Sequence, residues 1–139
     1  MSTMQVDIVS AEREIFAGEV EMLFAPASLG EVGVLPGHAA MLTQLRPGEV
    51  RVQLKGGETQ AFYVSGGMLE VQPKAVTVLS DTAIRAHDLD EAAVLKAKQE
   101  AEEALADRSG HIDFARAQAE LAELAAQLLT IQRLRRRGG

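Results

Sequence analysis

In the first half of the chain, apolar and polar residues alternate in a pattern that predicts short β-strands. Apolar side chains at every second position predict a half-buried strand over 4–9. The same alternation predicts strands over 50–54 and 59–64. These two strands are separated by Gly56-Gly57, and paired glycines supply the positive φ that both central residues of a type I′ turn require. The pattern therefore predicts a β-hairpin at this point.

Glycine and proline predict many further reversals in the same half. Nine of the twelve glycines and all four prolines precede Lys74. Both residues interrupt regular elements, because glycine permits positive φ whereas proline restricts φ and lacks an N–H donor. The pattern predicts further strands over 15–16, 20–24, 32–35, 68–72 and 75–79, with turns at Gly18, Pro26, Pro36-Gly37, Arg46-Pro47-Gly48, Ser65-Gly66-Gly67 and Pro73-Lys74. Eight or nine short strands in about 80 residues are typical of an antiparallel sandwich.

The second half of the chain predicts two long helices. Between Asp88 and Arg137 there is one glycine, Gly110, and no proline. We expect a helix over 89–107 and a second over 113–135, joined near Gly110 into an antiparallel hairpin. The run Asp88-Leu89-Asp90-Glu91 resembles a capping box, with Asp88 as the capping residue.

Apolar residues on the two helices predict the contact between them. Spacings of three and four on the second helix indicate a heptad seam, and the first helix has apolar residues at intervals of four. The predicted seam consists of Leu89, Ala93, Ala97, Ala101 and Leu105 with Phe114, Ala117, Leu121, Leu124, Leu128 and Ile131. The first helix contributes mostly alanine methyls, which bury little apolar surface. Our hypothesis is a hairpin that closes but can be opened.

Together these patterns predict an α+β fold with two parts. The first is an antiparallel β-sandwich domain over 1–86, and the second is a helical hairpin over 87–139. The chain has no cysteine, which excludes disulfides, thiolate metal sites and a cysteine nucleophile.

Charge is distributed unevenly along the chain. The net charge of −6 argues against nucleic acid as the main partner, because phosphate binding needs a basic surface. The segment 124–139 nevertheless holds four arginines and no acidic residue. They are Arg133, Arg135, Arg136 and Arg137. Two interpretations stay open: cations that complement the dipole at a helix C-terminus, or contact with an acidic partner surface.

The residues that could carry chemistry do not form a catalytic pattern. Ser65-Gly66-Gly67 lacks the following Lys-Ser/Thr and helix of a phosphate loop, so a turn is the better interpretation. The histidines His38, His87 and His111 lack metal-ligand spacing. We therefore predict neither a metal site nor an autonomous enzyme.

The sequence also predicts no direct association with a membrane. No apolar run approaches the ~20 residues that cross a bilayer. The first seven residues lack the basic and apolar regions of a signal peptide. We expect any membrane association to occur through a partner.

One segment is unusual because small, flexible residues surround an acid and a histidine. It reads Gly-Glu-Val-Gly-Val-Leu-Pro-Gly-His over 30–38. This segment resembles the signature of the ε subunit of bacterial F-type ATP synthase. The motifs at 45–48, 65–73, 76–83 and 88–92 are also similar, in the expected order. The resemblance covers nearly the whole chain from 9 onward.

The resemblance implies a fold and a role. The fold is a sandwich of about ten strands followed by the hairpin. The role is a non-catalytic central-stalk subunit of the rotor in a complex that makes ATP from ADP with a proton gradient. Its implied partners are the γ subunit, the c-ring and the α/β catalytic head. The implied location is peripheral, on the cytoplasmic side of the bacterial inner membrane.

The resemblance also implies two contact surfaces. Glu31, His38, Met41 and Leu42 would face the c-ring, although the same segment can also be read as a plain sandwich corner. The hairpin would open to inhibit ATP hydrolysis, with basic residues of the last helix meeting acidic residues of the head. The candidates are Arg116, Arg133, Arg135, Arg136 and Arg137.

This chain departs from the family members that bind ATP on the hairpin. Those members carry an arginine where this chain has Ala93, and arginines on the second helix where it has Glu123 and Gln127. Without those cations we predict weak or absent ATP binding, and no cofactor.

Two other classes of function also fit these patterns. One is a sandwich with a coiled-coil adaptor that dimerises through its helices. The other is a nucleotide sensor outside an ATP synthase, against which the missing arginines argue.

Overall fold

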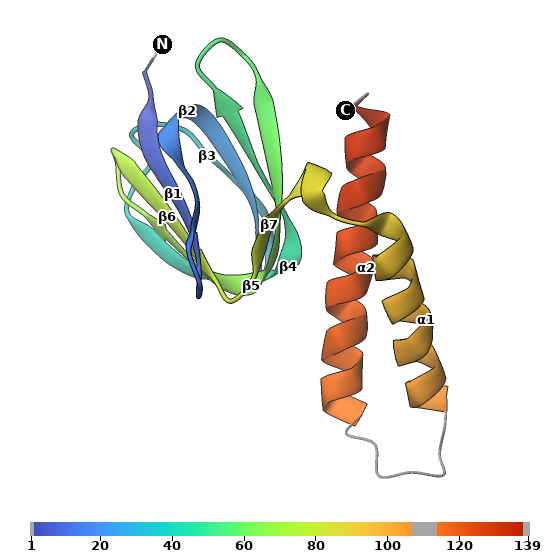
Figure 1. The fold of residues 1–139 in the computed structure, drawn as a ribbon. Helices are drawn as coiled ribbons and strands as arrows, with labels where there is room; N and C mark the ends of the chain where they lie inside the picture. Colours follow the sequence, from blue (N-terminus) through green and yellow to red (C-terminus); the bar gives the residue numbers. More distant parts are fainter. Residues whose placement is uncertain (1, 107–113, 138–139) are drawn as a thin grey trace.

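The computed structural model describes residues 2–106 and 114–137, and its N-terminal half is a β-sandwich (Figure 1). One sheet runs in the order β1-β6-β5-β4-β2-β3, and β7 pairs with β5. Because β1 pairs with both β6 and β2, the sheet curls round and closes over its own inner face. The strands are β1 (Met4–Ser10), β2 (Glu14–Ala27), β3 (Gly30–Val34), β4 (Met41–Leu54), β5 (Thr59–Val71), β6 (Ala75–Ser80) and β7 (Ala83–Arg85).

The predicted sandwich class is confirmed, but the predicted strand count is wrong. The pairing is also not antiparallel throughout, because β1 and β6 pair in parallel. The described residues contain seven strands, fewer than the eight or nine expected from the pattern or the ten implied by the resemblance. The expected turns at 46–48 and 65–67 lie inside β4 and β5, which stay paired on both sides of them. Likewise Gly18 and Pro26 lie within β2. Glycine and proline at these points bend long strands without reversing them.

Gly67 shows why the bend in β5 requires glycine. Its φ is +125°, which residues with a side chain rarely adopt. A Cβ atom at this position would also collide with the backbone carbonyl of Leu79 in β6. The bend therefore brings the backbones of two strands closer than any side chain permits.

Several predicted turns are confirmed. Gly56 and Gly57 both have positive φ and connect β4 to β5, as predicted. The turn is closed by Gly57, whose N–H donates to the carbonyl of Leu54 at 2.9 Å, so it is centred on Lys55-Gly56. The expected type I′ turn centred on the two glycines is therefore wrong. The turns at Pro36-Gly37 and Pro73-Lys74 lie between strands, as expected.

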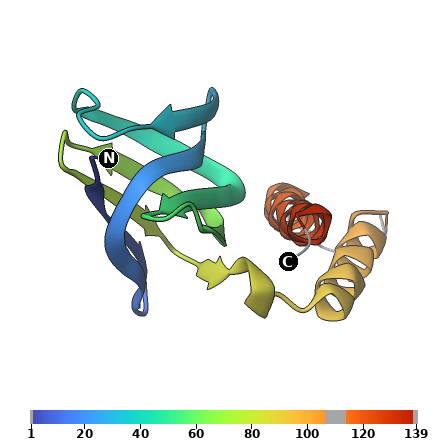
Figure 2. The same cartoon turned by 90° about the horizontal axis from the view of Figure 1, so that it is seen from above.

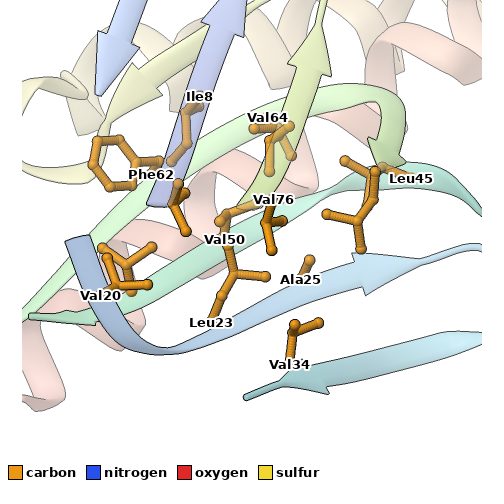
Figure 3. Close-up of a cluster of buried hydrophobic side chains, with 14 of the residues drawn as sticks. Ile8, Val20, Leu23, Ala25, Val34, Leu45, Val50, Phe62, Val64 and Val76 are labelled. Carbon is orange, nitrogen blue, oxygen red and sulfur yellow. The ribbon is translucent and has the colours of Figure 1, made fainter. Parts of the chain in front are cut away.

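An aliphatic core fills the sandwich. Alternate residues of each strand point inward, as the period of two predicts, and their side chains meet between the layers (Figure 3). Phe62 is the one fully buried phenylalanine among the described residues, and it packs against Phe16 at a centroid distance of 5.5 Å. The core includes Ile8, Val20, Leu23, Ala25, Val34, Leu45, Val50, Phe62, Val64 and Val76.

The C-terminal half forms the predicted antiparallel helical hairpin. A short 3₁₀ turn, η1 (Ala86–Asp88), leads from the sandwich into α1 (Glu91–Ala106), and α2 (Phe114–Arg136) returns beside it. Figure 2 shows α2 between the sandwich and α1. Helix α2 packs on β4, β5 and η1. The expected helix ends near 107 and 113, the stop at Ser109-Gly110 and His111 lie outside the described residues.

The helix start differs from the prediction by two residues. The N–H of Ala93 donates to the Asp90 carboxylate at 3.2 Å, which makes Asp90 the capping residue. Asp88 lies in η1 instead, where it contacts His87. The predicted cap at Asp88 is therefore wrong, because the 3₁₀ turn takes up that part of the chain.

The residues predicted to form the seam between the two helices are buried to different degrees. Ala101 and Ile131 are buried. Ala93, however, is exposed, and Val94 is buried in its place. On an α-helix, residues four apart differ in direction by about 40° around the helix axis. Ala93 lies two such steps before Ala101 and therefore points away from the side on which Ala101 is buried. Val94 lies seven residues before Ala101 and points to nearly the same side. The structure does not describe the side chain of Phe114. Seven predicted seam residues are half-buried: Leu89, Ala97, Leu105, Ala117, Leu121, Leu124 and Leu128.

Candidate functional site

The candidate site is the contact between α2 and the outer face of β4 and β5. Tyr63 in β5 is fully buried although its neighbours Phe62 and Val64 point into the sandwich core. Its side chain therefore lies on the opposite face, which α2 covers. Burial raises the pKa of Tyr63 far above its usual value, and the nearby Glu123 carboxylate raises this pKa further. A side-chain hydrogen bond with Gln127 lowers the pKa of Tyr63 in part. The phenol is thus enclosed between sandwich and hairpin.

Acidic side chains gather beside the phenol. Burial raises the pKa of Glu123, and the carboxylates of Glu120 and Asp81 raise it further. Glu120 precedes it on α2, whereas Asp81 follows β6 on the sandwich. Closing the hairpin therefore brings negative charges from both halves together, which favours the protonated form of Glu123.

An ion pair between a buried carboxylate and a partly exposed arginine holds the end of the hairpin to the sandwich. The Glu49 side chain in β4 is 1% exposed, and Arg137 donates to its two oxygens at 3.3 and 3.0 Å. Two parallel N–H···O bonds are the strongest geometry for this pair of groups. Because Val50 and Val52 point into the core, Glu49 lies on the outer face, where α2 and its arginine cover it.

A second arginine extends this ion pair along the sheet. Arg51 places its Nε 3.4 Å from Glu49 and its Nη2 3.0 Å from Glu31 in β3. Its guanidinium lies 4.7 Å from the centroid of the Phe24 ring, which orients it. Four side chains therefore form a continuous alternating chain: Arg137, Glu49, Arg51 and Glu31. We call these four residues the ion-pair chain.

Comparison with known proteins identifies the molecule that carries this site. The model of the ATP synthase delta/epsilon chain β-sandwich domain matches residues 3–86, and the model of the delta/epsilon chain long α-helix domain matches 87–132. The chain belongs to the ATP synthase delta/epsilon chain family. Within the described residues, no helix is both long and apolar enough to span a membrane.

Named relatives agree with this family. The chain is 66% identical to the ATP synthase epsilon chain of Nitrosococcus oceani, over 99% of this chain and 98% of that one. It is 60% identical to ATP synthase epsilon chain 1 of Methylococcus capsulatus, over 96% of each.

Solved structures are similar as well. One is a chain of the Euglena gracilis mitochondrial ATP synthase, OSCP/F1/c-ring structure, with a TM-score of 0.76 and 25% identity, covering 93% of this chain and 80% of that one. A chain of the Tetrahymena thermophila mitochondrial ATP synthase central stalk and c-ring shares the fold, with a TM-score of 0.58 and 13% identity, covering 94% and 97%.

The four residues predicted to face the c-ring line two surface hollows and the loop between β3 and β4 in this delta/epsilon chain. Glu31 lines a cleft of about 440 Å³ that Glu49 and Arg133 also line. Met41 and Leu42 line a different depression of about 460 Å³ at the start of β4. His38 lies in the intervening loop, where its Nδ1 is 2.7 Å from the carbonyl of Ala39.

The predicted head-contacting arginines have different environments. Arg137 is in the ion-pair chain, and Arg135 pairs with Glu91 at the start of α1. Arg133 lines the cleft beside Glu31, and Arg136 is exposed. Arg116 lies on the exposed side of α2 near its start. Arg135 and Arg137 are therefore already paired within the chain when the hairpin is closed.

Sequence reasoning missed Glu49, Arg51 and Tyr63. The predicted strand over 50–54 began after Glu49 and placed Arg51 on a face expected to meet water. The sequence did contain one indication of this contact. Tyr63 is a large aromatic residue between the core residues Phe62 and Val64, and consecutive buried side chains indicate a strand that is covered on both faces.

Proposed function

We propose that this chain is a non-catalytic central-stalk subunit of a bacterial F-type ATP synthase, which makes ATP from ADP in the presence of a proton gradient. The sandwich, 1–86, links the γ subunit to the c-ring, and the hairpin, 87–139, restrains ATP hydrolysis by contacting the α/β head. The subunit is peripheral to the bacterial inner membrane, on its cytoplasmic side.

The single observation that carries the proposal is the match of both halves to one family. The two domain models follow each other along residues 3–132, and the relatives named as epsilon chains align over nearly the full length. The similar Euglena chain comes from an assembly with F1 and a c-ring. No group of three or more metal-ligand residues gathers in the part of the chain that the structure describes.

The closed hairpin supports a regulatory role for the second half. The face of α2 that meets the sandwich carries Glu123, Gln127 and a buried Thr130 besides its apolar residues. A contact rich in polar groups can separate at lower cost than an apolar one, because water replaces the lost hydrogen bonds. Opening would also release Arg137 from its carboxylate for an acidic surface on the head.

The surface proposed to meet the c-ring comprises Glu31, His38, Met41 and Leu42. Leu42 is 66% exposed and Leu35, between Glu31 and His38, is 55% exposed. Exposed leucines beside a carboxylate favour contact with another protein.

The experiment compares the assembled complex containing the full chain with one whose chain ends at His87. We expect the truncation to raise ATP hydrolysis and to retain synthesis under a proton gradient. A second variant, Arg133→Gln with Arg136→Gln, keeps the pairs made by Arg135 and Arg137 and should raise hydrolysis partway. Unchanged hydrolysis in both variants would refute the inhibitory role, and loss of synthesis with the truncated chain would refute the division of roles between the two halves.

A further inference from the structure

The Arg137–Glu49 pair has the geometry of a latch between the two halves of the molecule. It joins residues 88 positions apart and is one of two arginine–carboxylate pairs at the end of α2. The other, Arg135–Glu91, joins the two helices to each other and moves with the hairpin. Among the described residues, Arg137 therefore makes the ion pair that hairpin opening must break.

Burial makes this pair sensitive to the loss of either partner. The Glu49 side chain is 1% exposed, and a buried carboxylate is costly unless cations compensate it. In the closed molecule Arg137 and Arg51 share that compensation. When α2 leaves, Glu49 gains water, so opening replaces the lost arginine by hydration.

Arg51 connects this latch to a distant part of the surface. Its guanidinium bridges Glu49 and Glu31, and the Glu31 side chain is 45% exposed. If Glu31 is neutralised, Arg51 keeps its full charge for Glu49 and repels Arg137 more strongly. Arg137 then gains less from closure, and the hairpin opens more readily.

We propose that Glu49 is the latch residue of the hairpin and that Arg51 couples its strength to the charge state and contacts of Glu31. A cationic partner group that occupies Glu31 would thereby favour the open hairpin. By linkage, opening the hairpin would strengthen the binding of that cation to Glu31 to the same degree. The value of this coupling for regulation rests on the proposed function, whereas the latch itself does not.

The test measures opening of the isolated full-length chain. Tyr63 is its one tyrosine, tryptophan is absent, and the phenol lies beneath α2. Acrylamide quenching of Tyr63 fluorescence and hydrogen exchange of the α2 amides therefore report opening. Exchange of the β5 core amides reports whether the sandwich stays folded.

The variants are Arg137→Gln, Glu49→Gln and Glu31→Gln, with Arg136→Gln as the matched control. Arg136 is exposed and adjacent to Arg137, so its removal changes net charge and helix dipole equally. We expect Arg137→Gln to raise the opening constant roughly 5–30-fold. Glu31→Gln should raise it about 2–5-fold, within the range of a weak charge coupling. Arg136→Gln should leave it unchanged.

A double-mutant cycle tests the coupling itself. In the Glu49→Gln background Arg137→Gln should no longer weaken closure, because the partner of Arg137 is absent. In an Arg51→Gln background Glu31→Gln should have no further effect, because the residue that couples Glu31 to the latch is absent. If Arg137→Gln behaves like Arg136→Gln, the latch is refuted. If Glu31→Gln has no effect, or the same effect without Arg51, the coupling through Arg51 is refuted. The isolated chain hydrolyses no ATP in these measurements, so either failure leaves the inhibitory role to be tested separately.

Discussion

Arg135, in the last turn of α2, donates a hydrogen bond to the carboxylate of Glu91, in the first turn of α1 and 44 residues earlier. The end of the hairpin is thereby tied to its beginning, next to the point where the chain leaves the sandwich. An anion at a helix N-terminus and a cation at a helix C-terminus also each complement the helix dipole. One pair therefore stabilises both helix ends.

Loss of this pair should loosen the start of α1 without unfolding the molecule. The Arg135 side chain is 66% exposed, so we expect Arg135→Gln to cost about 0.5 kcal/mol. Hydrogen exchange should become faster at 91–95 and stay unchanged in the sandwich strands. Arg136→Gln provides the control, and equal effects of the two substitutions would show that the Glu91 contact contributes nothing.

Closure of the hairpin should depend on pH through Glu123. Its pKa is raised in the closed state, so the closed state binds the proton more tightly than the open one. Closure should therefore strengthen as pH falls from neutral into the range between the raised pKa and the usual value of about 4.5, and weaken as pH rises through it. Quenching of Tyr63 fluorescence measures this directly.

Two variants isolate the contribution of Glu123 to that pH dependence. Glu123→Gln should be more closed at pH 7 and should lose the pH dependence. Glu120→Gln, the matched control on the same helix, should retain a reduced dependence because it removes one of the like charges that raise the Glu123 pKa. An unaltered pH response in Glu123→Gln would rule out this residue as its source.

Gly67 should tolerate substitution far less than Gly57. Both have positive φ, but a Cβ at Gly67 would strike the Leu79 carbonyl, whereas one at Gly57 meets open space. We expect Gly57→Ala to cost about 1 kcal/mol and Gly67→Ala more than about 3 kcal/mol in the free energy of unfolding. Urea denaturation of the two variants measures the difference, and similar midpoints would mean that β6 shifts away without cost.

The hairpin should not bind ATP. Ala93 is exposed and uncharged, and Glu123 lies near the carboxylates of Glu120 and Asp81. Phosphate groups would meet negative charge at the closed hairpin. Calorimetry with the full chain should show no saturable binding with a Kd below about 1 mM. Micromolar affinity would contradict this prediction.

Reversing the charge of Glu31 should impair coupling in the assembled complex. Glu31→Lys would place a cation on the surface proposed to face the c-ring and would also repel Arg51. We expect proton-driven ATP synthesis to fall several-fold. Glu58→Lys, the same charge change on the exposed β4–β5 loop, should leave synthesis unchanged. Equal synthesis by both variants would remove Glu31 from the coupling surface.

Local sequence patterns were sufficient to predict which parts of this chain form strands and which form helices. Alternation with period two placed the buried residues of β1 correctly, because side-chain direction in a strand is a local property. Glycine and proline also separated the strand half from the helical half. They misled at 46–48 and 65–67, because a bend within a strand and a reversal between strands use the same residues.

The tertiary structure decided what the sequence left open about the site. Sequence alone determined that Arg51 lies on the polar face of a strand, that a cluster of arginines ends the last helix, and which family the chain resembles. It did not determine that α2 covers that face, because the register between two packed elements depends on all of their contacts at once. Only the folded molecule brings Arg137 to Glu49 and encloses Tyr63, since burial and ion pairing between distant residues arise from packing and not from any local pattern.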